Sequence, residues 1–280
     1  MTPRPSSTAF TARHEALLEA LARYRFLTIP LAVRLGVGDR SRVRESLAEL
    51  ETRRLVNVAR REKSLGKPYV FTLSARGAAL LEEWAAEGGE TRTVPVRKSP
   101  VRVGAGLDQK LCTVSALMAL DAWAAREGAS VGRVVAEYDP HPQGLLQAAT
   151  AVEFEGVKYT ADALAQIRAP DGEEWLFALE VETGGIEGRI DNFRAHLPAR
   201  LEVFSSDVLD NALGWPETNR AARCLFIFDT ADLLAAAQRL VAGSKGDVWR
   251  KVLLNTLPNV ERDFAAGWWR ADGTAGSLFR

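Results

Sequence analysis

The sequence predicts an α+β protein of two domains, a small helical domain at the front and a larger α/β domain behind it. With 280 residues, the chain is longer than a single hydrophobic core usually serves. Its 47% hydrophobic and 26% charged residues are typical of a globular protein. Residues 1–103 hold 19 Lys and Arg against 11 Asp and Glu, whereas the remainder holds 17 against 25. A basic front part indicates a nucleic-acid reader.

The composition also argues against a membrane or secreted protein. No apolar run approaches the roughly 20 residues that a membrane helix needs. The first ten residues lack the apolar core of a signal peptide. Cys112 and Cys224 are too few for a disulfide framework or a four-cysteine zinc site. We therefore expect a cytoplasmic protein with two buried thiols and no membrane partner.

The front domain, residues 1–90, has the order of elements of a winged helix-turn-helix. The stretch from Arg13 to Val56 predicts three helices, the second of which stops at Gly36 and the third of which is capped by Asp39 or Ser41. Two β-rich segments and a helix over residues 74–86 follow. The apolar positions of the three helices are Leu17, Leu18, Leu21, Tyr24, Ile29, Leu31, Leu35, Val43, Leu47 and Leu50.

In a winged helix the third helix enters the major groove of double-stranded DNA. Three arginines stand at its start, and four further cations lie in the β-rich segments, where they would contact phosphates. The predicted DNA-binding residues are Arg40, Arg42, Arg44, Arg60, Arg61, Lys63 and Lys67. The alternative is a solvated basic face on a protein-protein adaptor with no nucleic-acid role.

Residues 91–106 are rich in Gly, Pro and basic residues without helical period, which predicts a linker. Residues 107–280 then alternate between helical and β patterns. A strong helix begins at Leu107, β-rich segments cover 131–139 and 150–159, and two strands flank the Pro170-Asp171-Gly172 turn. A helix, the strand 223–230 and another helix follow. This alternation predicts a covered sheet in an α/β domain.

Three carboxylates stand out in the two strands around that turn. Asp162 is expected in the first strand, and Glu180 and Glu182 on one face of the second. A five-residue loop, 169–173 or 170–174, sets Asp162 opposite Glu180 or Glu182, so the three would converge. Such a cluster needs a cation or basic neighbours, and Mg²⁺ or Mn²⁺ would suit it for phosphodiester cleavage. Asp162, Glu180 and Glu182 are thus the candidate catalytic residues, with Asp162 and Glu180 as metal ligands. The alternative is a solvent-facing edge strand.

These residues also carry a resemblance to a known family. The chain resembles the replication-relaxation family in four features. These are the winged helix, the segment TADAL with Asp162, the segment FALEVETGG with Glu180 and Glu182, and the tail from Val248 to Gly273. The second domain of that family is similar to the PD-(D/E)xK nuclease fold. The resemblance implies DNA processing in plasmid or mobile-element replication or transfer.

Two positions depart from the nuclease pattern. Ala161 stands where Pro is expected, and Glu182 takes the place of the Lys that would polarise the attacking water. Arg189 or Arg194 could supply the charge instead, or form ordinary surface ion pairs. The chain is therefore expected to be either a metal-dependent endonuclease or a degenerate one. The alternative is a non-enzymatic transcriptional regulator or replication accessory whose second domain binds a protein partner or forms a homodimer.

Two further candidates lie outside this motif. Trp268 and Trp269 could stack on nucleic-acid bases, or pack at a domain surface. His141, between two prolines, could be a ligand or a general base, although a lone loop histidine usually is neither.

Overall fold

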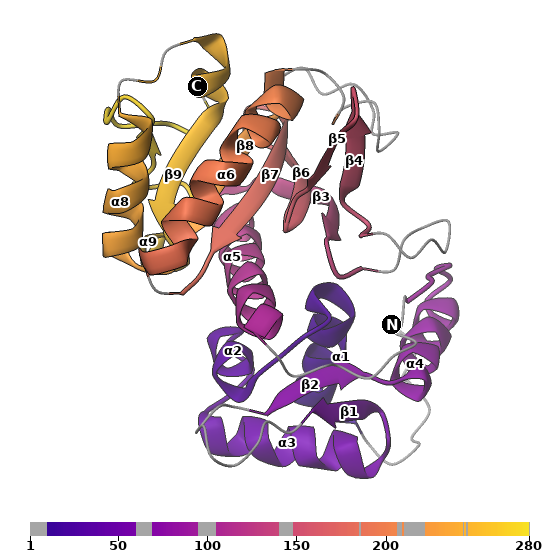
Figure 1. Cartoon of the computed structure of the whole chain (residues 1–280). Helices are drawn as coiled ribbons and strands as arrows, with labels where there is room; N and C mark the ends of the chain where they lie inside the picture. The colour runs from indigo at the N-terminus through magenta and orange to yellow at the C-terminus, as the bar shows by residue number, and fades with distance from the viewer. Residues whose placement is uncertain are drawn as a thin grey trace. The chain divides into compact units, whose positions relative to one another are not determined.

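The protein is a mixed α/β chain. The computed structural model describes residues 10–59, 69–94, 105–139, 148–184, 186–205, 209, 222–242, 244 and 246–279. The chain divides into two compact units, Met1–Leu107 and Asp108–Arg280 (Figure 1). Within the described residues, no helix is both long and apolar enough to cross a membrane.

Three capped helices open the N-terminal unit. They are α1 (Ala12–Tyr24), α2 (Ile29–Arg34) and α3 (Arg40–Thr52). Of the two caps predicted for α3, Asp39 is the one used, because its Oδ1 accepts the N–H groups of Ser41 and Arg42 at 3.0 Å each. Such caps satisfy backbone donors that have no partner inside the helix. The predicted apolar positions are buried, except Leu35, which is partly exposed at the C-cap of α2.

A small antiparallel sheet and a fourth helix complete this unit. Strand β1 (Val56–Ala59) pairs with β2 (Val70–Leu73), and Leu27 adds a bridge to Phe71. Helix α4 (Ala75–Glu87) follows. A Cβ on Gly77 would lie 2.2 Å from the carbonyl oxygen of Leu55, so only glycine permits this close approach of α4 to the start of the sheet. Residues 60–68, with the predicted contacts Arg60, Arg61, Lys63 and Lys67, lie outside the described residues.

A mixed sheet forms the centre of the second unit, in the order β10-β9-β8-β7-β6-β3. Its first three strands along the chain pair antiparallel, β7, β8 and β9 run parallel, and β10 returns antiparallel. The strands are β3 (Ser130–Ala136), β6 (Ala163–Arg168), β7 (Glu174–Glu182), β8 (Arg223–Phe228), β9 (Val252–Thr256) and β10 (Trp269–Arg270).

Helices cover both faces of this sheet. Leu176 and Ala178 of β7 join the core that includes Phe193 and Leu233, from the helices on one face (Figure 1). On the other face, Phe177 contacts Phe279, whose ring stacks on Trp123 of α5. The helices of this unit are α5 (Ala105–Glu127), α6 (Ile186–Ser205), α8 (Ala231–Val241), α9 (Leu257–Arg262) and the short 3₁₀ helix η2 (Asp247–Lys251). The covered sheet predicted from the alternating pattern is therefore confirmed.

The segment before β6 differs from the sequence-based expectation. Residues 151–160 form a separate hairpin, β4 (Ala151–Phe154) and β5 (Val157–Thr160). Glu155 and Gly156 turn the chain with φ of 50° and 83°, the left-handed pair of a tight hairpin turn. Asp162 was expected within a strand but lies between β5 and β6. The chain leaves one sheet and enters the other there.

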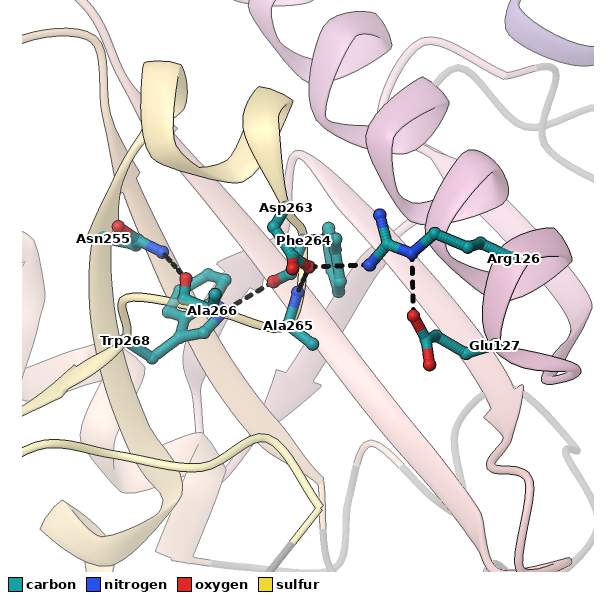
Figure 2. A network of polar contacts seen from close by, with 8 residues as sticks. All are labelled: Arg126, Glu127, Asn255, Asp263, Phe264, Ala265, Ala266 and Trp268. Carbon is teal, nitrogen blue, oxygen red and sulfur yellow. Dashed lines mark hydrogen bonds and ion pairs between the residues drawn. The ribbon is translucent and has the colours of Figure 1, made fainter.

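Figure 2 shows how the end of α5 is joined to the segment after α9. Arg126 lies at the end of α5, and its Nη2 donates to Asp263 Oδ1 at 3.1 Å. The same carboxylate oxygen accepts the backbone N–H of Ala265 at 3.2 Å. Both charged side chains are partly exposed, so this contact orders the turn and contributes little stability.

Two hydrogen bonds then fix the approach to β10 (Figure 2). Asn255 of β9 donates from Nδ2 to the carbonyl of Ala266 at 2.9 Å, and the indole N–H of Trp268 donates to the carbonyl of Phe264 at 2.7 Å. Trp268 is consequently packed inside, with 1% of its surface exposed. The packing alternative predicted for the tryptophan pair is confirmed for Trp268.

Candidate functional site

The start of α3 presents three arginines to solvent. Arg40, Arg42 and Arg44 are exposed, while Val43 and Leu47 on the opposite side are fully buried. Arg42 Nε lies 3.4 Å from Asp39 Oδ2, and both side chains are more than half exposed, so this ion pair is weak. The positive end of the helix dipole adds to the three charges. The geometry therefore suits an anionic partner.

Contacts to α1 hold α3 in place. Arg13 of α1 donates to the carbonyl of Val37 at 2.8 Å, just before α3. His14 Nε2 lies 3.1 Å from Glu49 Oε2 of α3. Burial lowers the pKa of His14, so the imidazole is neutral at pH 7 and the contact does not depend on a full ion pair. The arginine-bearing helix is thus linked to α1 just before its start and near its end.

The hairpin of the second unit has the predicted register. Arg168 pairs with Glu174, so the loop is 169–173, one of the two loops considered from sequence. Ala163 pairs with Leu179, which places Asp162 level with Glu180. The opposition of these two residues is therefore confirmed, although Asp162 itself stands outside the strand.

Glu180 and Glu182 share one buried arginine. Arg200 of α6 places Nη2 3.1 Å from Glu180 Oε2 and Nη1 2.9 Å from Glu182 Oε1. The Glu180 side chain is 2% exposed and the Arg200 side chain 17%. The hydroxyl of Tyr159 donates to the other oxygen of Glu180. A basic neighbour, the second possibility raised by the sequence, therefore lies against both carboxylates.

Asp162 has different partners. Its Oδ1 accepts the side-chain N–H of Gln109 in α5 at 2.8 Å, and its Oδ2 accepts the backbone N–H of Val181 at 2.7 Å. The three carboxylates nevertheless interact, because, beside the larger effect of burial, the charge of Glu182 raises the pKa of Asp162 and the charge of Asp162 raises that of Glu180. Their convergence on one point stays a prediction. Strand alternation does not set the direction of Asp162, because the strand begins only at Ala163.

A divalent cation at this cluster would compete with protein donors for the carboxylate oxygens. All three carboxylates already face protein donors, and no group of three His, Cys, Asp or Glu in the described part of the chain could hold a metal ion. A metal ion prefers carboxylate oxygens that are not neutralised by a guanidinium. The catalytic and metal-binding roles of Asp162, Glu180 and Glu182 stay predictions from the sequence.

Burial shifts the protonation of this cluster. It raises the pKa of Asp162 to about 6, although hydrogen bonds from Val181 and Gln109 act in the opposite direction. It raises the pKa of Glu180 to about 8, against the effect of Arg200. A single guanidinium between two carboxylates leaves one negative charge uncompensated, so the more deeply buried carboxyl retains its proton more readily.

The sequence reasoning missed Arg200. Arg194, one of the two arginines proposed instead, forms an exposed pair with Asp191 at 3.5 Å. Arg189 lies beside Gly184, because a Cβ on that glycine would be 3.3 Å from Arg189 Nε. A signal was present, since Arg200 continues the buried stripe Phe193, Leu197 and Phe204 at helical spacing.

The two cysteines and His141 are the remaining candidates from the sequence. Cys224 is buried as expected, whereas Cys112 is half-buried. Burial raises the pKa of Cys112 to about 11 and that of Cys224 well above its ordinary value, so neither is a reactive thiolate near neutral pH. His141 lies outside the described residues.

Comparisons with known proteins identify no family. No protein-family model matches the chain, and no curated protein matches it. One solved structure, described as "Mechanism for regulation of DNA binding of Bordetella bronchiseptica BpsR by 6-hydroxynicotinic acid", is 24% identical over 29% of this chain and 58% of that chain, with a TM-score of 0.26. The match thus spans a little over half of that protein, and a likeness of this size is too small to assign a fold or an activity.

Proposed function

We propose that the N-terminal unit is a winged-helix DNA-binding domain that places α3 in the major groove. The exposed arginines at the start of α3, opposite its buried face, are the observation that carries this proposal. The excess of basic residues in 1–103 supports it. So does the order of elements, three helices followed by a two-stranded hairpin and a helix.

For the second unit we propose a degenerate nuclease-like domain of the PD-(D/E)xK type, as the resemblance to the replication-relaxation family implies. Its support is the order α5, three antiparallel strands, α6 and a parallel strand. Asp162 stands before the second of the three strands and Glu180 lies in the third. The pairing of Glu180 and Glu182 with Arg200 supports the loss of cleavage.

Together these features favour a DNA-binding protein without nuclease activity, acting in the replication or transfer of a plasmid or mobile element. The lysine that would polarise water is replaced by Glu182, which is itself held by Arg200. This chemistry favours an accessory or regulatory role over an endonuclease.

DNA binding is tested with a random labelled duplex and the full chain. We expect Arg40→Ala with Arg44→Ala to weaken binding about ten-fold and to reduce the slope of log affinity against log salt by about 0.9 for each lost phosphate contact. Arg76→Ala, which removes an exposed arginine of α4, is the matched control. Unchanged affinity and slope in the α3 variant would remove the proposed interface.

Cleavage is tested with supercoiled DNA and Mg²⁺ or Mn²⁺. We expect the wild-type chain to leave the DNA intact. Nicking that disappears in both Asp162→Ala and Glu180→Ala would show an active nuclease and overturn the degenerate assignment. Nicking that persists in these variants would indicate a contaminating enzyme.

A further inference from the structure

A pocket of about 580 Å³ lies between α8 and β10 in the second unit. Its volume is in the range of roughly 300 to 1,000 Å³ that small-molecule sites occupy. Leu234 and Ala271 line its apolar side, next to Trp269. Gln238, Arg239 and Asp272 line its polar side. An aromatic side chain and three polar groups therefore share one open depression.

Trp269 is one of the residues that line this pocket. It is 40% exposed, and within the described residues only Tyr69 is another large apolar side chain of comparable exposure. The hydrogen bond that fixes Trp268 inside the unit leaves its neighbour in the strand directed outward. No aromatic or cationic partner covers the Trp269 ring among the described residues, so an available aromatic face remains.

The polar side chains beside Trp269 are also available. Gln238 and Arg239 are consecutive in the last turn of α8, and Arg239 is exposed. Neither has a hydrogen bond or ion pair with the part of the chain that the structure describes. Asp272 is oriented by Thr274, whose backbone N–H and hydroxyl donate to Asp272 Oδ1 at 2.9 and 2.6 Å. The pocket thus combines an amide, a guanidinium and an oriented carboxylate.

We propose that this pocket binds a nucleobase, with the base stacked on Trp269, its polar edge facing Gln238 and an attached phosphate near Arg239. Stacking on an aromatic side chain is the interaction that every base can make, and an arginine nearby binds phosphate. An amide side chain both donates and accepts, as a base edge requires. The site is separate from the α3 surface and does not depend on the proposed duplex binding.

The test uses the full chain carrying Arg40→Ala and Arg44→Ala, so that binding through α3 is suppressed. Fluorescence anisotropy of a labelled twelve-nucleotide thymidine strand reports single-strand binding, and calorimetry with thymidine monophosphate reports binding of the free nucleotide. We expect Trp269→Ala to weaken binding of the ligand about ten-fold, and Trp269→Phe to retain most of it. Arg239→Ala should weaken binding and reduce its salt dependence.

Arg250→Ala is the matched charge control, since Arg250 is an exposed arginine of the same unit outside the pocket. If the strand binds and the monophosphate does not, the base comes from single-stranded nucleic acid. If both bind with similar affinity, the ligand is a free nucleotide. The proposal is overturned if neither probe binds at micromolar protein, or if Trp269→Ala binds as its parent does. Duplex binding by the chain with α3 intact, measured in parallel, keeps a failure here distinct from a failure of the proposed function.

Discussion

Arginine has opposite surroundings in the two units of this protein. At the start of α3, Arg40 and Arg44 are exposed and have no ion pair with described residues. In α6, Arg200 is largely buried, with 17% of its side chain exposed, and contacts two glutamates. An exposed arginine is available to an external anion, whereas a buried one neutralises charges of its own chain. The comparison shows that burial and partners, rather than charge alone, separate a binding surface from a structural network.

The largest expected effect comes from removing the buried arginine. Arg200→Met leaves Glu180 and Glu182 buried without their counter-charge, so we expect the free energy of unfolding of the second unit to fall by roughly 3 to 5 kcal/mol. Urea denaturation followed by far-UV circular dichroism measures this. Arg194→Ala, which removes an exposed arginine of the same helix, should change it by less than about 0.5 kcal/mol. Equal losses in the two variants would break the contrast between buried and exposed arginines.

A smaller effect is expected from pH. The folded-state pKa of Glu180, about 8, lies above its ordinary value of 4.5, so the folded state binds the proton more tightly than the unfolded state. The stability from this group is therefore complete below pH 4.5 and is lost as pH rises through 8. Between pH 5 and 8 we expect wild-type stability to fall relative to that of Glu180→Gln, measured by denaturation at each pH. Parallel pH profiles would show that Glu180 does not titrate in this window.

The smallest effect is expected from removing the N-cap of α3, the helix with the exposed arginines. Asp39→Ala removes the side-chain acceptor for the N–H groups of Ser41 and Arg42, so we expect faster amide exchange in the first turn of α3 with little change in overall melting. Hydrogen exchange followed by NMR measures it, and Asp39→Asn, which keeps an oxygen acceptor, is the control. Unchanged exchange in Asp39→Ala would mean that this turn is ordered by packing alone.

The sequence predicted the secondary structure well in some parts of the chain and failed in others. Local signals were sufficient for the helices of the N-terminal unit and placed the hairpin loop to within one residue, because caps, apolar periodicity and turn residues act over a few positions. They failed between β4 and β6, where Glu155 and Gly156 turn the chain inside a segment that appeared continuous. The two left-handed residues there include a glutamate, which sequence statistics do not favour in that conformation.

The sequence by itself limited the carboxylate opposite Asp162 to Glu180 or Glu182, since antiparallel register follows from the position of one loop, and the structure selected Glu180. It also determined that α3 begins with exposed arginines, since its apolar stripe faces the other way. Only the tertiary structure decided that Glu180 and Glu182 meet Arg200, whereas Asp162 binds Gln109. The reason is physical: these contacts join residues 18 to 53 positions apart, and such contacts depend on how α5 and α6 pack against the sheet.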